Sequence, residues 1–283
     1  MSAVSAQLVI IGLPGAGKTS FLAALWYLVQ HKQVDHRLEL KDFKGDMKYL
    51  NQIADLWAEF EPLPRTNPNT EQTVSMSLND TATNNSFMLT TPDLSGETFV
   101  AQLVGRQFTA SYDEFLRGSS GAMVFVSSVD YRKPSRINIA EPLIEEIGAV
   151  PNGDDDNSTS VPWDPEKMPT QVQVVELLQF IADRPYFKSP FRIALIISAW
   201  DSLLEEHTTP ATWMERELPL LAQFLESNRR LFDYTIYGVS AQGGDYEDVD
   251  KLTRMLPSER IMVVGRDAKN EHDLTEPLIW LTR

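Results

Sequence analysis

The chain has 283 residues, of which 25 are lysine or arginine and 40 are aspartate or glutamate, so its formal net charge is −15. This charge argues against a protein built mainly to bind nucleic acid or an anionic membrane, because both favour a basic surface. The absence of cysteine excludes disulfides, thiolate metal sites and a cysteine nucleophile. The length is enough for one large α/β domain or for two smaller ones.

The amino-terminal segment has no basic residue before its first apolar run, so we expect no signal peptide. The longest apolar stretch, residues 8–29, contains Lys18 and several glycines. A charge near the centre of such a stretch is costly in lipid. We therefore expect no membrane-spanning helix and a cytoplasmic protein.

The first third of the chain begins with a short β-branched run at residues 7–11, typical of a buried strand, and a helix is predicted from Lys18. A second helix is predicted at 45–60, before a proline-rich loop. Residues 72–78 alternate between polar and apolar, and a turn-rich segment joins them to a second strand at 86–91. These two strands predict an antiparallel hairpin.

The rest of the chain alternates helices and strands. Helices are predicted at 98–116, 141–147, 170–183, 211–228 and 274–282, and strands at 121–126, 191–199 and 232–239, with a short apolar run at 260–265. Strands separated by helices predict crossover connections, hence a mostly parallel sheet with helices on both faces. We expect one three-layer α/β/α domain over residues 1–283, with one antiparallel hairpin strand, an acidic surface insertion at 151–169 and a late insertion at 243–271.

The loop after the first strand contains the most specific motif of the chain. Gly12-Leu13-Pro14-Gly15-Ala16-Gly17-Lys18-Thr19 matches GxxxxGK[ST], with a strand before it and a helix after it. Gly15 and Gly17 let successive backbone N–H groups point inward at the positive end of a helix, which forms a nest for phosphate. Lys18 would reach the β- and γ-phosphates, and the Thr19 hydroxyl would ligate Mg²⁺. The motif, extended to Ser20, predicts the nucleoside-triphosphate site of a P-loop NTPase and leaves the base open.

A second short motif, Asp93-Leu94-Ser95-Gly96, follows the strand at 86–91. Asp93 would hold Mg²⁺ through a water, and Gly96 would let a backbone N–H approach the γ-phosphate. The competing interpretation is an ordinary helix N-cap after a strand. The position of the motif, one hairpin after the phosphate loop, favours the phosphate role.

Two later strands end in Ser198-Ala199-Trp200-Asp201 and Ser240-Ala241-Gln242. With these endings the chain resembles the Ras-like, translation-factor-type GTPases, whose corresponding strands end in N/TKxD and SA(K/L) and bind guanine. The resemblance implies that Asp201 accepts two hydrogen bonds from the base and that Ser240 and Ala241 form the base-contacting loop. Adenine offers no matching pair of donors, so a guanine nucleotide, GTP or GDP, is expected with Mg²⁺.

Three residues depart from the Ras-like pattern. Ser198 replaces asparagine or threonine of N/TKxD, Ala199 replaces the lysine whose stem lies along the base, and Glu97 replaces a water-orienting glutamine. Glu97 would orient or deprotonate the attacking water, although like-charge repulsion from a triphosphate opposes this role. Lys18 and Glu97 are therefore the catalytic candidates, and we expect slow hydrolysis.

The loop at residues 63–70 lies where this class has its first switch, in which a threonine ligates Mg²⁺. Thr70 is the first choice for this threonine and Thr66 the second, the alternative being that both are ordinary polar loop residues. Arg65 is either a solvated arginine or a source of positive charge for the transferring phosphoryl group.

Over nearly its whole length the chain resembles the double-GTPase (DO-GTPase) proteins of bacteria, in the segments GLPGAGKTSFLAALWYLV, DLSGE, SAWD, VSAQGGDY and HDLTEPLIWL. Those proteins are inferred to belong to conflict or defence systems. We expect a Mg²⁺-dependent GTP-binding protein that hydrolyses GTP slowly and uses the nucleotide state of its loops at 61–71 and 93–105 to change its affinity for a protein partner. A nucleotide-bound scaffold subunit without turnover, and an ATPase of the P-loop class, are the alternatives.

Overall fold

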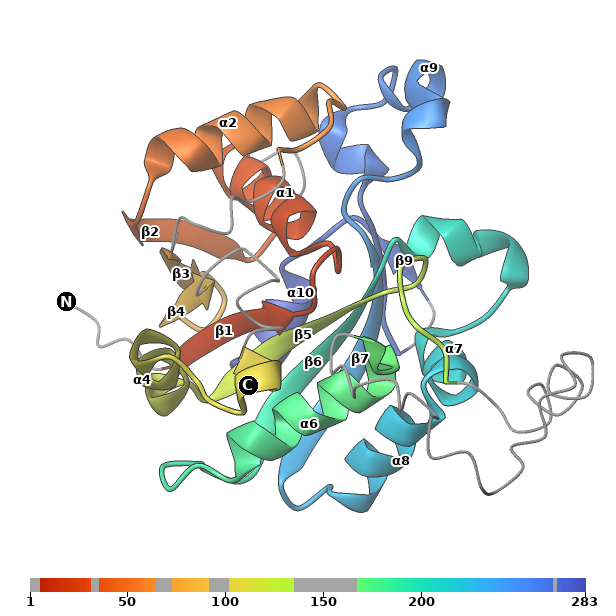
Figure 1. Ribbon diagram of the computed structural model, residues 1–283. Helices are drawn as coiled ribbons and strands as arrows, with labels where there is room; N and C mark the ends of the chain where they lie inside the picture. Colours follow the sequence, from red (N-terminus) through yellow and green to blue (C-terminus); the bar gives the residue numbers. More distant parts are fainter. Residues whose placement is uncertain (1–5, 32–35, 65–72, 92–101, 135–166, 267–268) are drawn as a thin grey trace, which may run out of the picture.

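Runs rich in Val, Ile, Leu and Phe form most of the strands of the protein. The computed structural model describes residues 6–31, 36–64, 73–91, 102–134, 167–266 and 269–283. Within these residues the strands are β1 (Ala6–Gly12), β2 (Leu38–Lys44), β3 (Val74–Asp80), β4 (Asn85–Thr91), β5 (Gly121–Ser127), β6 (Phe191–Ser198), β7 (Phe232–Ser240), β8 (Met262–Val264) and β9 (Asn270–Glu271). They form one nine-stranded sheet in the order β2-β3-β4-β1-β5-β6-β7-β8-β9 (Figure 1).

Parallel pairing occupies the centre of the sheet and antiparallel pairing its two sides. Strands β4, β1, β5, β6 and β7 are parallel neighbours. The pairs β2–β3, β3–β4, β7–β8 and β8–β9 are antiparallel. The predicted hairpin is the pair β3–β4, and β2, β8 and β9 add antiparallel strands at the edges that the sequence analysis does not assign.

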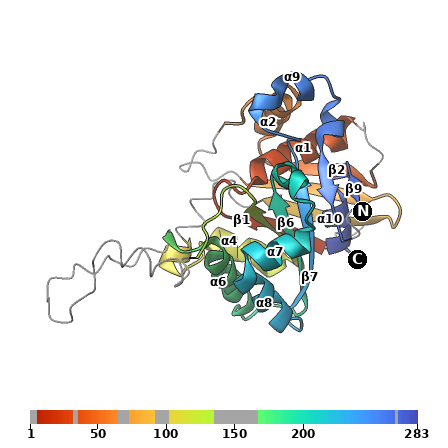
Figure 2. The same cartoon turned by 90° about the vertical axis from the view of Figure 1, so that its right-hand side faces the viewer.

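Helices cover both faces of the sheet, as Figures 1 and 2 show. They are α1 (Lys18–His31), α2 (Met47–Ala58), α4 (Ala110–Gly118), α6 (Thr170–Ala182), α7 (Pro210–Glu217), α8 (Pro219–Ser227), α9 (Val249–Leu252) and α10 (Glu276–Leu281), with 3-10 helices η2 (Trp200–Glu206), η3 (Tyr246–Asp248) and η4 (Pro257–Arg260). Alternate residues of β1 enter two cores. Leu8 and Ile10 pack with residues of α1, α2 and α10, and Val9 and Ile11 with residues of α4, α6, α7 and α8. The predicted three-layer α/β/α fold is confirmed.

The predicted helix at 211–228 is two helices, α7 and α8, which meet at Leu218. Leu218 has φ −126° and ψ 51° because the ring of Pro219 disfavours the helical conformation in the preceding residue. The predicted helix at 98–116 is also interrupted: the chain leaves the helical conformation at Arg106, and Thr109 caps the separate helix α4. The predicted helix at 141–147 lies outside the described residues, as does all of the acidic insertion except 167–169.

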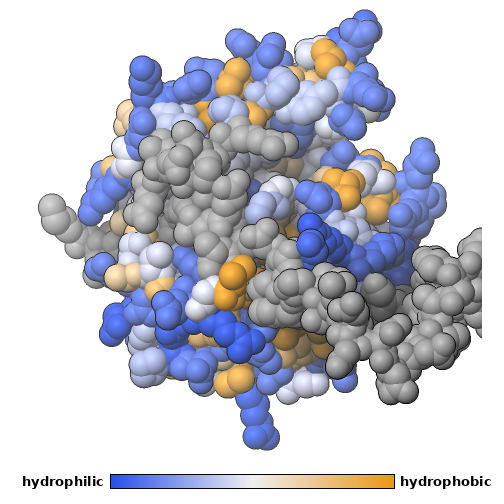
Figure 3. Space-filling model, viewed as in Figure 1, coloured by the Kyte–Doolittle hydropathy of each residue, from blue (hydrophilic) through white to orange (hydrophobic). Residues whose placement is uncertain are grey.

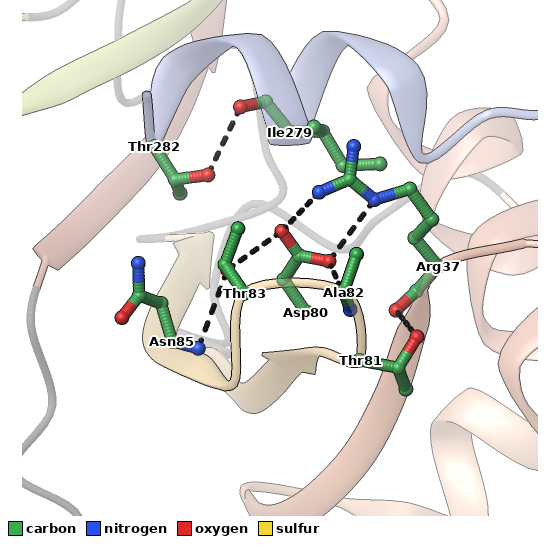
Figure 4. Close-up of polar contacts among 8 residues, drawn as sticks. All are labelled: Arg37, Asp80, Thr81, Ala82, Thr83, Asn85, Ile279 and Thr282. Atoms are coloured by element: carbon green, nitrogen blue, oxygen red, sulfur yellow. Dashed lines mark hydrogen bonds and ion pairs between the residues drawn. The ribbon is translucent and has the colours of Figure 1, made fainter.

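An ion pair fastens the edge strand β2 to the turn between β3 and β4 (Figure 4). Arg37 donates from Nε and from a terminal nitrogen to the two oxygens of Asp80, at 3.1 and 2.5 Å. Asp80 also accepts from Ala82 N and Thr83 Oγ1. Burial of Asp80 would raise its pKa, but the hydrogen bonds from Arg37, Thr83 and Ala82 outweigh burial and lower it. This network fixes the turn that connects the two strands of the hairpin.

On the face shown in Figure 3, hydrophilic residues predominate and apolar residues form small, separate patches. None of the helices in the described ranges is both long and apolar enough to cross a membrane.

Candidate nucleotide-binding site

The phosphate loop joins the end of β1 to the start of α1 and takes a backbone path that requires glycine. Gly15 has φ +69° and Gly17 has φ +83°, values in the left-handed region that side chains disfavour. A Cβ atom added to Gly15 would come within 2.8 Å of Asp130 Oδ2, and one added to Gly17 within 2.9 Å of Ser198 Cβ. The backbone conformation therefore favours glycine at both positions, and at Gly17 the Ser198 Cβ atom also leaves no space for a side chain.

The Lys18 ammonium lies over this loop. Its Nζ donates to the carbonyl oxygens of Gly12 and Leu13, each at 2.8 Å, and the residue is only 6% exposed. Lys18 is also the first residue of α1, so the positive end of the helix dipole adds to the charge of its side chain. An ammonium beside the N–H groups at a helix start suits an anion with several oxygens, such as a polyphosphate.

The chain turns sharply after β6, where the predicted base motif lies. Ala199 has φ +53°, and the 3-10 helix η2 begins at Trp200. The Trp200 ring is buried against Gly238 of β7, where an added Cβ atom would overlap the ring. Trp200 thus anchors the turn from within the core, and the next residue, Asp201, stays partly exposed at the start of η2.

Hydroxyl groups join the end of β5 to the same turn. Ser128 Oγ donates to the carbonyl oxygen of Ala199 at 2.9 Å, and Ser202 Oγ donates to the same oxygen at 2.8 Å. In the N/TKxD motif of the Ras-like pattern, a lysine at this position would lie along the base. Here the small Ala199 side chain leaves that role unfilled, while its backbone is held from two sides.

The second loop that is predicted to contact the base follows β7. Ser240 is 1% exposed, and its Oγ accepts a hydrogen bond from Gly243 N at 2.9 Å, which closes a tight turn. The carbonyl oxygen of Ala241 accepts from Trp57 Nε1 at 2.8 Å. A side chain of α2 therefore fixes the position of the Ala241 carbonyl group in this turn.

Strand register aligns these loops along one edge of the sheet. Gly12 pairs with Phe125 of β5, Ser127 of β5 with Ser198 of β6, and Ser198 with Val239 of β7. The loops that follow β1, β5, β6 and β7 thus emerge next to one another at the carboxyl ends of parallel strands. Open α/β sheets bind their ligands at this edge.

The remaining predicted site residues lie outside the described ranges. These are the switch-loop residues Arg65, Thr66 and Thr70 and the second-motif residues Asp93, Gly96 and Glu97. Of the predicted Mg²⁺ ligands, Thr19 is described, and it is the second residue of α1, next to the phosphate nest. A hydroxyl oxygen there suits Mg²⁺, which binds few protein ligands and completes its shell with phosphate oxygens and water. Among the described residues no group of three or more His, Asp or Glu side chains could hold a metal ion.

Asp130 is a residue of this edge that the sequence analysis does not identify. Its backbone N–H donates to Ser127 Oγ at 2.9 Å, which turns the chain back after β5 and brings the carboxylate against Gly15. The signal in the sequence was the polar segment Ser127-Ser128-Val129-Asp130 at the end of a buried strand. Polar residues that follow a central parallel strand are candidates for ligand contact.

Comparison with known proteins identifies the family. None of the curated proteins matches the chain. A family model described as Double-GTPase 1 (DO-GTPase1) matches residues 9–281, a span that begins within β1 and ends with α10. The protein is therefore a member of the double-GTPase family.

Proposed function

We propose that this protein binds a guanine nucleotide at the carboxyl edge of its parallel strands. The phosphates would lie in the loop of Gly12, Pro14, Gly15, Ala16, Gly17, Lys18, Thr19 and Ser20. The base would lie between Asp201 and the turn of Ser240 and Ala241. The observation that carries the proposal is the phosphate loop, in which two left-handed glycines curve the backbone beneath a buried ammonium.

Selection of guanine rests on Asp201. A carboxylate offers two acceptor oxygens to the N1–H and the exocyclic amine of guanine, whereas adenine has no such pair of donors. Binding adenine would leave a desolvated carboxylate without partners, at a cost of about 1–3 kcal/mol or more. Membership of a family named for GTPases supports the same choice of base.

Hydrolysis would require Mg²⁺, for which Thr19, Thr70 and Asp93 are the proposed ligands. Bound Mg²⁺ neutralises negative charge on the β- and γ-phosphates. Lys18 would bind the same phosphates, and the backbone N–H of Gly96 would bind the γ-phosphate. Glu97 would orient the attacking water, and repulsion between its carboxylate and the triphosphate would keep the reaction slow.

In this proposal the nucleotide state is transmitted by the loops at 61–71 and 93–105, which change the affinity for a protein partner. The resemblance to bacterial DO-GTPases suggests a conflict or defence system as the setting. We also propose that residues 1–283 form a single Ras-like GTPase domain with insertions at 151–169 and 243–271. One sheet that takes strands from residues 6 to 271 supports this domain organisation.

Isothermal titration of the full chain with GTP, GDP and ATP in the presence of Mg²⁺ tests the proposal. We expect GDP and GTP to bind at least tenfold more tightly than ATP, and Lys18→Ala to abolish triphosphate binding while the circular dichroism spectrum stays native. Equal affinity for ATP, or binding that survives Lys18→Ala, would overturn it. Phosphate release in a single turnover with excess protein then distinguishes a slow GTPase from a nucleotide-bound scaffold subunit.

A further inference from the structure

The end of α2 is bonded to the candidate base loop across the molecule. Trp57, in the last turn of α2, is fully buried and donates its indole N–H to the carbonyl oxygen of Ala241 at 2.8 Å. The two residues are 184 positions apart in the sequence. A hydrogen bond to the backbone of this turn constrains the loop that is proposed to contact guanine.

Arg260 strengthens the same connection. It is 3% exposed, and one of its terminal nitrogens donates to the carbonyl oxygens of Trp57 and Ala58, at 2.9 and 3.0 Å. These are carbonyl groups of the last turn of α2, where the helix dipole favours a cation. A Cβ atom added to Gly243 would come within 2.6 Å of the Arg260 carbonyl oxygen, so the base loop passes directly over the backbone of Arg260.

The chain leaves α2 through a strained residue. Phe60 has φ +62°, a left-handed conformation that is usually left to glycine at the end of a helix. The Phe60 N–H donates to the Trp57 carbonyl oxygen and the Glu61 N–H to that of Leu56, which completes a Schellman motif. Because such a conformation is unfavourable in a residue with a side chain, contacts elsewhere must hold it.

Those contacts come from the segment that follows β7. The Phe60 ring lies 5.2 Å from the Arg260 guanidinium and 5.3 Å from the Tyr246 ring. The Tyr246 hydroxyl donates to the carbonyl oxygen of Glu61. Figures 1 and 2 show α9, which follows β7 in the chain, beside the end of α2. The exit from α2 is thus held by the segment that continues from the base loop.

We propose that Trp57, Phe60, Tyr246 and Arg260, called here the Arg260 latch, couple guanine binding at residues 240–243 to the backbone at the end of α2, residues 57–61. The inference rests on the proposed function of the base loop. A nucleotide that orders the Ala241 turn strengthens the bond to Trp57 and stabilises the strained exit at Phe60. By thermodynamic linkage, loosening that exit weakens the binding of the nucleotide by the same factor.

A pair of matched variants tests the coupling. Trp57→Phe removes the indole N–H that donates to Ala241 O at 2.8 Å, whereas Trp26→Phe removes an indole N–H that donates to Asn51 Oδ1 within the α1–α2 pair, at 2.9 Å. From the usual strength of one hydrogen bond, we expect Trp57→Phe to accelerate GDP dissociation about threefold to tenfold. Trp26→Phe should leave the rate within about twofold of the wild type.

Hydrogen exchange of a peptide covering residues 56–63, measured with and without GDP, provides a second readout. A variant that only destabilises the fold would exchange faster in both conditions and would keep the difference that GDP makes. GDP should protect this peptide in the wild type and in Trp26→Phe, and the GDP-dependent protection should be lost in Trp57→Phe. Tyr246→Ala should also reduce the GDP-dependent protection of this peptide. Tyr246 is 42% exposed, so its truncation should leave the fold intact. Equal dissociation rates and equal protection in the two tryptophan variants would overturn the latch. Failure of the wild type to bind GDP would instead overturn the proposed function.

Discussion

The side chain of Ser198 lies against the backbone of Gly17: a Cβ atom added to Gly17 would be 2.9 Å from Ser198 Cβ and 3.0 Å from its Oγ. Ser198 is the last residue of β6 and the first residue of the predicted base motif, and Gly17 is the last glycine of the phosphate loop. A shift of the turn after β6 toward Gly17 would therefore displace the phosphate loop. The candidate phosphate and base subsites are therefore in direct contact at Gly17 and Ser198, with no space between them for an additional methyl group.

Gly17→Ala should abolish nucleotide binding. The added methyl group would strain a backbone at φ +83° and collide with Ser198, so the loop would lose its inward curve. Gly265→Ala is the matched control, because a Cβ atom added there meets its neighbours only at 3.4 Å or more, which is ordinary van der Waals contact. Titration with GDP should show at least a hundredfold loss of affinity in the first variant and an unchanged constant in the second. Retained binding in Gly17→Ala would contradict the role of this loop.

Asp130→Asn should tighten the binding of GDP about threefold to tenfold. The Asp130 carboxylate lies against Gly15, and a unit negative charge about 4 Å from another contributes about 1 kcal/mol of repulsion even in water. Asp183→Asn removes the same charge from an exposed residue after α6, at the opposite edge of the sheet, and should change nothing. The measurement is GDP affinity at low and high salt, since screening should shrink the gain. Weaker binding in Asp130→Asn would instead indicate that the carboxylate accepts a hydrogen bond from the nucleotide.

The sequence predicts the centre of the sheet better than its edges, because burial on both faces leaves an uninterrupted apolar run. Strand β5 is buried along its whole length and was predicted at 121–126. Strand β2 was missed: the register with β3 shifts between Leu40 and Asp42, and this bulge breaks the alternation that would reveal an edge strand. Only Leu38 of β2 is fully buried, and the strand contains several charged residues, so its sequence lacks the apolar pattern of a strand.

The phosphate loop could be predicted because its function and its conformation are encoded in eight consecutive residues. Contacts that close the site across the fold have no such local signature. Nothing in the sequence near Trp57 indicates that its indole reaches Ala241, and nothing near Asp130 indicates that it meets Gly15. The Asp130 contact forms because the parallel strands β1 and β5 end at one edge, and the Trp57 contact forms because the end of α2 packs on the turn after β7.

Asp201→Asn should reverse the selection of the base. The amide of the variant keeps one acceptor and gains a donor, so it no longer matches the two donors of guanine. Xanthine carries a carbonyl oxygen where guanine carries the exocyclic amine, and this oxygen accepts from the amide. Competition assays should show GDP weakened about tenfold or more and xanthosine diphosphate strengthened. Glu205→Gln, an exposed residue of the same helix η2, is the control, and unchanged selectivity in Asp201→Asn would refute the assignment.

A cluster around Glu217 predicts how the protein responds to acid. Its Oε2 accepts from the Tyr131 hydroxyl at 2.6 Å and pairs with Lys133 Nζ at 2.8 Å, while its Oε1 pairs with Arg216 Nε at 2.7 Å. Burial alone would raise the pKa of Glu217, but the hydrogen bonds from Lys133, Tyr131 and Arg216 lower it to about 2. The unfolded chain has a glutamate pKa of about 4.3. Since the native pKa is the lower one, this carboxylate stabilises the fold above about pH 4.3, and its contribution disappears as pH falls toward 2.

Glu217→Gln should therefore lower the free energy of unfolding at pH 7 and flatten its decline between pH 5 and pH 2. The amide cannot replace the charge that Lys133 and Arg216 face, and it does not titrate. Glu215→Gln removes the same charge from an exposed position on α7 and should keep the wild-type pH profile. Urea unfolding at several pH values gives the comparison. The difference in stability between Glu217→Gln and the wild type should shrink as the solution is acidified, because protonation removes the same charge from the wild type; a difference that stays constant with pH would show that the cluster acts through packing alone.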